Sequence, residues 1–252
     1  MSNLLWNLYA KCYDRITALL PYQEMLDDVV STLDLRPGMR VFDAGCGTGA
    51  LAERLAARHP GIELVAADLS SSMMKRARTR QIWPASFTFI EGNIDDVLTN
   101  DERGFDRIAS VNVIWTLPDP QGTFAKMAAR LREGGRMVHT TPNWRFRAHA
   151  IVWRHLVGHH GWGRLRALLG LPVLALAGLL NLLLVLQSMV LARAPRASKR
   201  WHAEGLAELL RATGTPPSTM RPCYAEQDVL IVCEKEPSSA EGARLPVPGV
   251  HL

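Results

Sequence analysis

The chain has 252 residues, of which 48% are hydrophobic and 21% are charged. These values are typical of one large globular domain, or of one domain with an insertion, and they exclude a chain too small or too polar to bury a core. The net charge of +5 is uneven, because the stretch from Gly134 to Ala203 holds ten basic and no acidic residues.

The first twenty residues mix apolar side chains with Lys11, Asp14 and Arg15. A secretory signal has a basic start and then an uninterrupted apolar core, so we expect none here. The four cysteines form no CxxC pair and show no metal-ligand spacing, which indicates reduced thiols in a cytoplasmic protein.

A strand–loop–helix–strand unit follows at residues 39–68. The first strand ends at Asp43, a loop with Gly45 and Gly47 comes next, and the second strand ends at Asp68. Glycines let a ligand approach the backbone, and a helix amino terminus attracts anions, so a dinucleotide is one interpretation. However, the Asp43 carboxylate would repel a pyrophosphate and suits a cationic ligand without phosphate, such as S-adenosylmethionine (SAM).

"VFDAGCGTG" resembles the first motif of class I SAM-dependent methyltransferases, and four further motifs follow in the family's order. The resemblance implies that Asp43, Gly45 and Gly47 hold SAM. In "AADLSSSMM", it places Asp68 on the ribose and Met73 near the adenine.

Two later motifs complete the cofactor site that the resemblance implies. In "FIEGNIDD", Asn93 and the backbone amide of Ile94 would read the adenine edge, although the family more often has Asp where Asn93 stands. In "FDRIASVNVIWTLPDP", Asn112 would lie near the methionine end of SAM. Tyr13, in "LYAKCYD", matches an amino-terminal helix that closes over SAM in the ubiquinone/menaquinone methyltransferase-like group.

The resemblance predicts an α/β fold: a Rossmann-like seven-stranded sheet with an inserted hydrophobic helical cap. The amino-terminal helix and SAM-binding core would span residues 1–144, and the cap residues 145–200. The final helix and two strands would span residues 201–236, followed by a flexible tail at 237–252.

No residue stands out as a general base. His139, after the fifth strand, and Tyr13 are the candidates for polarising or orienting the methyl acceptor, with Tyr224 beside them; for His139, a structural role is favoured over this one. His149, His155, His159 and His160 lie in an arginine-rich run without Asp, Glu or Cys. We therefore predict no metal site.

Residues 167–192 contain no charged side chain. One helix of this length would be ~39 Å long and could cross a hydrocarbon core of ~30 Å. A crossing conflicts with the fold, because strands of one sheet precede and follow the run. Gly170, Leu171 and Pro172 offer a break, so we expect two or more helices. Tryptophans and arginines flank the run, which favours peripheral or monotopic contact with an anionic membrane; a soluble lid or a homodimer surface is the alternative.

The sequence thus predicts a SAM-dependent methyltransferase acting on a lipophilic small molecule: a lipid amine, a quinone or an alkylated aromatic metabolite. We expect the protein in the cytoplasm, at the inner face of the membrane. We expect no nucleic acid as partner, because proteins that bind nucleic-acid phosphates need no long aliphatic run between their arginines. The alternatives are a soluble natural-product tailoring methyltransferase with a buried lid, and a non-catalytic SAM-binding membrane-associated protein.

Overall fold

A computed structural model describes residues 3–142, 147–159 and 203–236, together with positions 163, 170, 172, 175 and 179. Most of the predicted cap and the whole predicted tail therefore lie outside the described residues. The domain boundaries proposed above stay predictions.

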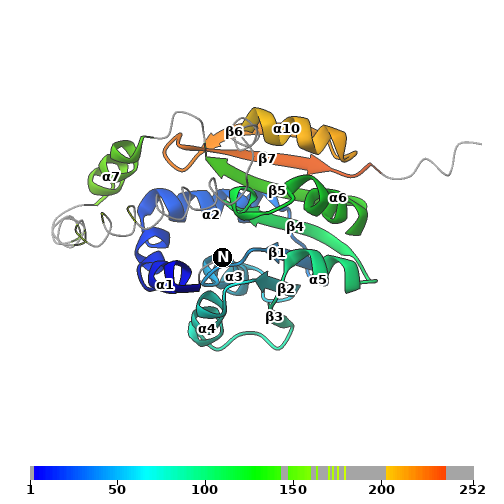
Figure 1. Cartoon of the computed structure of the whole chain (residues 1–252), viewed down its shortest axis with the longest axis horizontal. Coiled ribbons are helices and arrows are strands. Elements are labelled where there is room, and N and C mark those ends of the chain that lie inside the picture. The colour runs from blue at the N-terminus through cyan, green and yellow to red at the C-terminus, as the bar shows by residue number, and fades with distance from the viewer. Residues whose placement is uncertain are drawn as a thin grey trace, which may run out of the picture.

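Seven strands form one sheet in the order β3-β2-β1-β4-β5-β7-β6 (Figure 1). Strands β1 to β5 are parallel, and β7 lies antiparallel between β5 and β6. The strands are β1 (Arg40–Ala44), β2 (Glu63–Asp68), β3 (Phe87–Glu91), β4 (Phe105–Val111), β5 (Leu131–Pro142), β6 (Pro217–Cys223) and β7 (Asp228–Glu234). This topology confirms the predicted Rossmann-like seven-stranded sheet.

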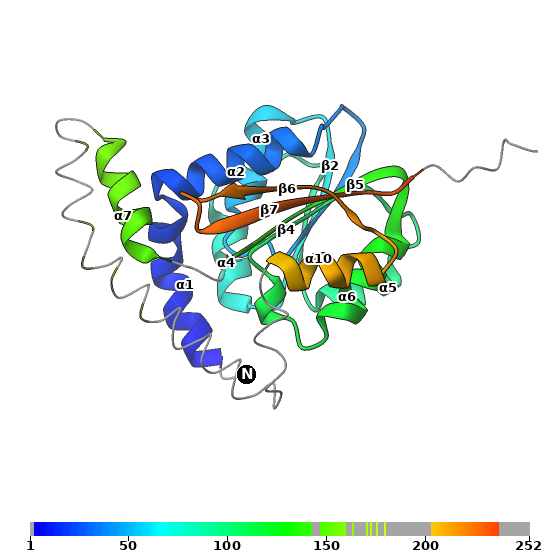
Figure 2. The ribbon, with the colours of Figure 1, turned by 90° about the horizontal axis from the view of Figure 1, so that it is seen from above.

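Helices cover both faces of the sheet, as the view in Figure 2 shows. On one face lie α2 (Leu20–Thr32), α3 (Ala50–Arg58) and α4 (Ser71–Thr79), with α1 (Asn3–Thr17) in contact with α2 and α4. On the other face lie α5 (Ile94–Asn100), α6 (Pro120–Arg130) and α10 (Ala203–Ala212). A 3-10 turn, η1 (Ile114–Thr116), follows β4.

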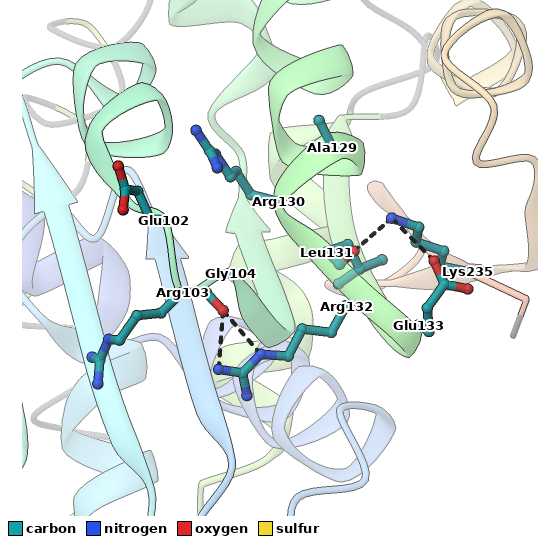
Figure 3. A pocket seen from close by; sticks show the side chains of 9 residues that line it. All are labelled: Glu102, Arg103, Gly104, Ala129, Arg130, Leu131, Arg132, Glu133 and Lys235. Atoms are coloured by element: carbon teal, nitrogen blue, oxygen red, sulfur yellow. Dashed lines mark hydrogen bonds and ion pairs between the residues drawn. The ribbon is translucent and has the colours of Figure 1, made fainter. Parts of the chain in front are cut away.

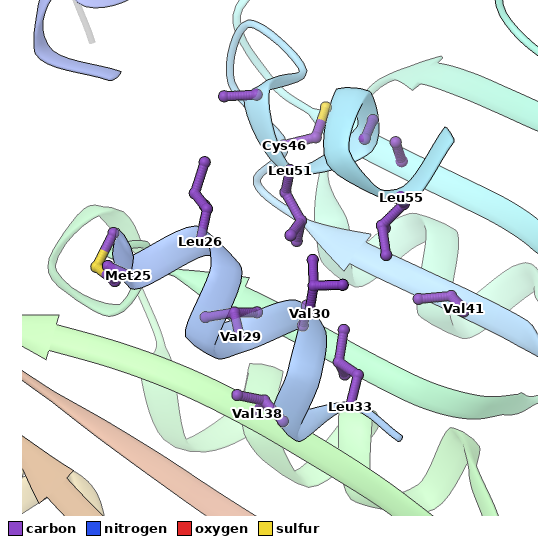
Figure 4. Close-up of a cluster of buried hydrophobic side chains, with 14 of the residues drawn as sticks. Met25, Leu26, Val29, Val30, Leu33, Val41, Cys46, Leu51, Leu55 and Val138 are labelled. Atoms are coloured by element: carbon purple, nitrogen blue, oxygen red, sulfur yellow. The ribbon is translucent and has the colours of Figure 1, made fainter. Parts of the chain in front are cut away.

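The core is divided by the sheet into two apolar clusters. In one, α2 packs its buried face against α3 and the sheet, with Leu26, Val29 and Val30 pointing inward (Figure 4). In the other, Phe42 and Phe105 stack with ring centroids 5.0 Å apart, and Phe124 of α6 lies in the same cluster. Strands β1 and β2 are largely apolar on both faces because both faces are covered.

The start of the predicted cap is helix α7 (Ala148–Val157), which packs against α2. Ile151 is buried, and Nδ1 of the buried His155 accepts a hydrogen bond from the backbone N–H of Leu20 at 3.1 Å. On the outer side, Trp153 is 70% exposed and Val157 is 43% exposed. Among the described residues, no helix combines the length and the apolar character needed to cross a membrane.

Candidate functional site

The predicted cofactor residues meet at the carboxyl edge of the parallel strands, where ligands bind in open α/β sheets. Asp43 lies near the end of β1 and is 2% exposed. Its Oδ2 has no hydrogen-bond partner in the described part of the chain, and neither has Oγ1 of the buried Thr48 in the following loop. Burial, and secondly the charge of Asp68, raise the pKa of Asp43 to about 7. A cation held here would restore the charge of this carboxylate.

The loop after β1 depends on glycine at two positions. Gly45 has φ +76°, and a Cβ there would lie 2.5 Å from Cγ2 of Val113. Gly47 has φ +56°, and a Cβ there would lie 3.2 Å from Cε1 of Tyr13. Side chains are therefore excluded where the loop passes under α1 and beside the end of β4.

Asp68 ends β2 and is fixed by two backbone donors. Its Oδ2 accepts the N–H of Gly47 at 2.9 Å, and its Oδ1 accepts the N–H of Ser70 at 2.8 Å. Burial raises the pKa of Asp68, while these two hydrogen bonds oppose the shift. Each oxygen keeps one further acceptor position, which is what two adjacent ribose hydroxyls require.

Helix α1 lies over the glycine loop. Asp14 of α1 pairs with Arg76 at 2.8 Å and with Arg80 at 3.0 Å, so that α1 is anchored to α4 and the residue after it. Tyr9 packs beside Met73 in a small apolar cluster, which brings the predicted adenine residue against this helix. The structure thus brings Tyr13 and Met73 together with the glycine loop.

Asn93 and Ile94 begin α5 after β3. The Oδ1 of Asn93 accepts the backbone N–H of Asp95 at 3.0 Å and caps the helix. The side chain of Ile94 is buried in the cluster on the α6 side of the sheet. Their contacts with adenine remain a prediction, and the capping bond explains why a short amide side chain suits position 93.

Asn112 directly follows β4 and has φ +56°. Its backbone N–H is 3.1 Å from the backbone oxygen of Thr140 on β5, and its Nδ2 donates to Oδ2 of Asp228 at 2.7 Å. Asp228, the first residue of β7, is fully buried, and burial raises its pKa to about 7.

His139 lies on the face of the sheet that α6 covers. Val138 of β5 belongs to the α2 cluster and Met137 to the α6 cluster, so alternation directs His139 toward α6. Its ring meets Phe124 edge-on at 4.7 Å, and the residue is 1% exposed. Burial lowers the pKa of His139 to about 3, and neither ring nitrogen has a partner among the described residues. This environment favours the structural interpretation of His139 over the catalytic one.

Two residues at this edge were missed by sequence reasoning: Asp228 and Tyr22 of α2. The hydroxyl oxygens of Tyr22 and Tyr13 are 3.0 Å apart, and the ring of Tyr22 meets that of Tyr224 edge-on at 5.6 Å. The available signal for Asp228 was an acid directly before the apolar run of residues 229–233.

The surface hollow shown in Figure 3 is not part of this site. It is lined by Glu102, Arg103 and Gly104 before β4 and by residues around the start of β5, at the amino ends of these strands. Three of its basic side chains, those of Arg130, Arg132 and Lys235, donate to backbone oxygens. The residues fit SAM at the carboxyl edge instead. The unpartnered carboxylate of Asp43 suits an ammonium group. The glycine loop lets a ligand approach the backbone closely, and the fixed carboxylate of Asp68 suits the two hydroxyls of a ribose.

Part of the chain is similar to known methyltransferases. Residues 41–135 match the methyltransferase domain family model. The ubiquinone biosynthesis O-methyltransferase of Alkalilimnicola ehrlichii is 29% identical over 119 residues, which are 47% of each chain. The chain therefore spans about half the length of the curated relatives it matches.

Two solved structures share the fold over most of their length. The complex between the Haloferax volcanii Trm112 methyltransferase activator and a methyltransferase has a TM-score of 0.61 at 16% identity, covering 91% of this chain and 97% of that one. Magnesium protoporphyrin IX methyltransferase of Synechocystis PCC 6803, with bound S-adenosylhomocysteine, has a TM-score of 0.56 at 16% identity, covering 90% and 94%. The chain thus has the fold of class I SAM-dependent methyltransferases, and part of it matches the methyltransferase domain. Within that class, the matched half of the chain resembles the ubiquinone biosynthesis O-methyltransferases.

Proposed function

We propose that this protein transfers the methyl group of SAM to a hydroxyl group of a lipophilic aromatic acceptor, of the chemical kind that quinone synthesis uses. The observation that carries the cofactor half of the proposal is Asp43, a buried carboxylate with a free oxygen beside the glycine loop. The acceptor class rests on the names of the relatives and on the apolar run at residues 167–192.

When bound, SAM supplies a methyl carbon whose bond to the sulfonium sulfur breaks with its electron pair as the acceptor oxygen bonds to that carbon. The chain contributes binding and alignment through Asp43, Asp68 and the glycine loop. Helix α1 covers the loop through Tyr13 and keeps water from the site. Alignment and exclusion of water are the main requirements of such a displacement.

The first test is methyl transfer itself. Purified protein, incubated with SAM and a detergent extract of membranes, should release S-adenosylhomocysteine, and one lipophilic phenol should gain the mass of a CH2 group in mass spectrometry. If the methylated compound is an amine instead, the acceptor is a lipid amine and not a hydroxyl group. A modified water-soluble compound would support the tailoring enzyme, and release from no extract would support a non-catalytic SAM-binding protein.

We further propose that the region around the apolar run contacts the inner face of the membrane. Support comes from the acid-free stretch between Gly134 and Ala203 and from the outer side of α7, where Trp153 and Val157 are exposed one helical turn apart. Exposed tryptophan and basic residues are typical of membrane interfaces.

Vesicle sedimentation tests this contact. The protein should sediment with vesicles containing anionic lipid, sediment less with neutral vesicles, and be released in part as salt screens the basic residues. Trp153→Ser should weaken sedimentation, whereas a change of the exposed Ile82, remote from α7 in the sequence, serves as the control. Recovery in the supernatant at every lipid composition would favour the lid or the homodimer surface.

A further inference from the structure

One buried carboxylate at the carboxyl edge, Asp228, is not among the predicted cofactor residues. Asp228 is 0% exposed, and its Oδ2 accepts Nδ2 of Asn112 at 2.7 Å. Its Oδ1 has no hydrogen-bond partner within the described residues. A buried carboxylate oxygen without a partner is unfavourable by several kcal/mol at most positions, so such groups are rare outside functional sites.

The backbone before Asp228 is held in a strained form. Tyr224, Ala225 and Glu226 have φ values of 50°, 53° and 64°, three consecutive non-glycine residues in the left-handed region. The side chain of Gln227 fixes this turn by donating to the oxygen of Ala225 at 2.9 Å and by accepting the N–H of Arg147. Strain of this kind persists where surrounding contacts fix it, and it clusters at functional sites.

Asp228 lies on the same face of the sheet as the tyrosines. Leu230 and Val232, two and four residues further along β7, belong to the α2 cluster, so alternation directs Asp228 to that face. Tyr224 meets Tyr22, and Tyr22 meets Tyr13, which lies over Gly47. A continuous row of phenol side chains therefore runs from the glycine loop to the strand end that carries Asp228.

The neighbouring titratable groups cannot accept a proton at neutral pH. Burial raises the pKa of Tyr13 to about 12 and raises the pKa of Tyr22 and Tyr224 as well, so the three phenols stay protonated. Burial likewise raises the pKa of the Cys223 thiol at the end of β6. Asn112 and Thr140 do not titrate.

We infer that Asp228 is the catalytic base of this methyltransferase and that its Oδ1 accepts the hydroxyl proton of the methyl acceptor. The inference rests on the proposed function. As the acceptor oxygen bonds to the methyl carbon, its proton moves to Oδ1 and Asp228 becomes a neutral acid, which later loses that proton to water. Asn112 keeps Oδ2 engaged and turns Oδ1 toward the acceptor. Because Asp228 is fully buried, a side chain beside it has to move before the acceptor arrives.

The test uses Asp228→Asn, which keeps the shape and can still accept from Asn112. Glu234→Gln, at the other end of β7 and paired with Arg136, is the matched control. The probe is 4-nitrocatechol, a phenol whose visible spectrum changes when it ionises. With S-adenosylhomocysteine present, Asp228→Asn should bind the probe roughly 10- to 150-fold more weakly than the wild type or the control. Affinity for S-adenosylhomocysteine should change less than about threefold. If Asp228 only supported the structure of the site, its replacement should weaken the binding of S-adenosylhomocysteine as well.

Transfer to the acceptor found in membrane extract should fall by about 10²- to 10⁴-fold in Asp228→Asn, and the acid limb of the wild-type pH profile should vanish. Equal probe affinity in wild type and variant, no probe binding by the wild type, or a loss that follows S-adenosylhomocysteine affinity would each overturn the inference. If Asp228→Asn does not fold, Asn112→Ser exposes Oδ2 instead and should alter the ionisation of the bound probe; an unchanged spectrum would also overturn it. Probe binding that depends on Asp228 without transfer to any acceptor would count against the proposed function and the catalytic role of Asp228, but not against its contact with a phenol.

Discussion

Replacing Asp68 with alanine should weaken the binding of both SAM and S-adenosylhomocysteine by roughly 10- to 150-fold, because a charged hydrogen-bond acceptor is worth ~1.5–3 kcal/mol. The side chain accepts the amides of Gly47 and Ser70, so its loss also frees the glycine loop from its anchor. Both effects act in the same direction. Isothermal titration calorimetry measures the affinity directly.

Asp27→Ala provides the control for this experiment. Asp27 is a carboxylate of α2 that pairs with Arg54 at 2.6 Å, away from the end of β2. It should leave the cofactor affinity unchanged, and circular dichroism should show both variants folded. Unchanged affinity in Asp68→Ala, or tight binding of NAD by the wild type, would contradict the assignment of this carboxylate to the ribose of SAM.

His139→Leu should change how the free energy of unfolding depends on pH. Burial lowers the pKa of His139 to about 3 in the folded chain, whereas an unfolded chain has the ordinary value near 6.5. Below pH 6.5 the unfolded state therefore binds a proton that the folded state does not bind. The free energy of unfolding falls as the pH falls toward 3. Between pH 6.5 and 4.5 the wild type should lose about 2.3 kcal/mol more than the leucine variant.

Urea unfolding of both proteins at several pH values measures this difference in the free energy of unfolding. The contributions of other titrating groups are the same in both proteins and cancel. Parallel curves would show that His139 is accessible to protons in the folded chain. Methyl transfer and SAM affinity should be retained in the variant, because the ring packs against Phe124 on the face of the sheet opposite to α2 and Asp228. If the rate of methyl transfer fell by about 10²-fold or more while SAM affinity stayed the same, His139 would have a catalytic role.

The residues that the sequence could place are those whose role depends on local structure. Asp43 lies one residue before the end of β1 and Asp68 ends β2. A parallel sheet brings such strand ends to one edge, so their meeting follows from the order of the motifs. The face of His139 could not be predicted. A strand buried on both sides has no polar alternation to mark which side chains point where.

Asp228 and Tyr22 escaped prediction for a different reason. Asp228 meets Asn112 across 116 positions of the chain, and Tyr22 meets Tyr224 across a still longer interval. Both contacts arise because β7 enters the sheet beside β5 and because α2 lies on that face. No short motif encodes such a pairing.

The position of β7 also bears on how such a chain can diversify. Pro142 of β5 pairs with Asp228 of β7, and about 85 residues separate them along the chain; yet each doubling of a flexible connection adds only ~0.6 kcal/mol of closure entropy. The part of this segment between α7 and α10 can thus change in length at a small entropic cost while the hydrogen-bonded ladder that joins β5 to β7 stays the same. The sequence between α7 and α10 can therefore diverge in evolution while the glycine loop and the carboxyl ends of β1 and β2 stay the same.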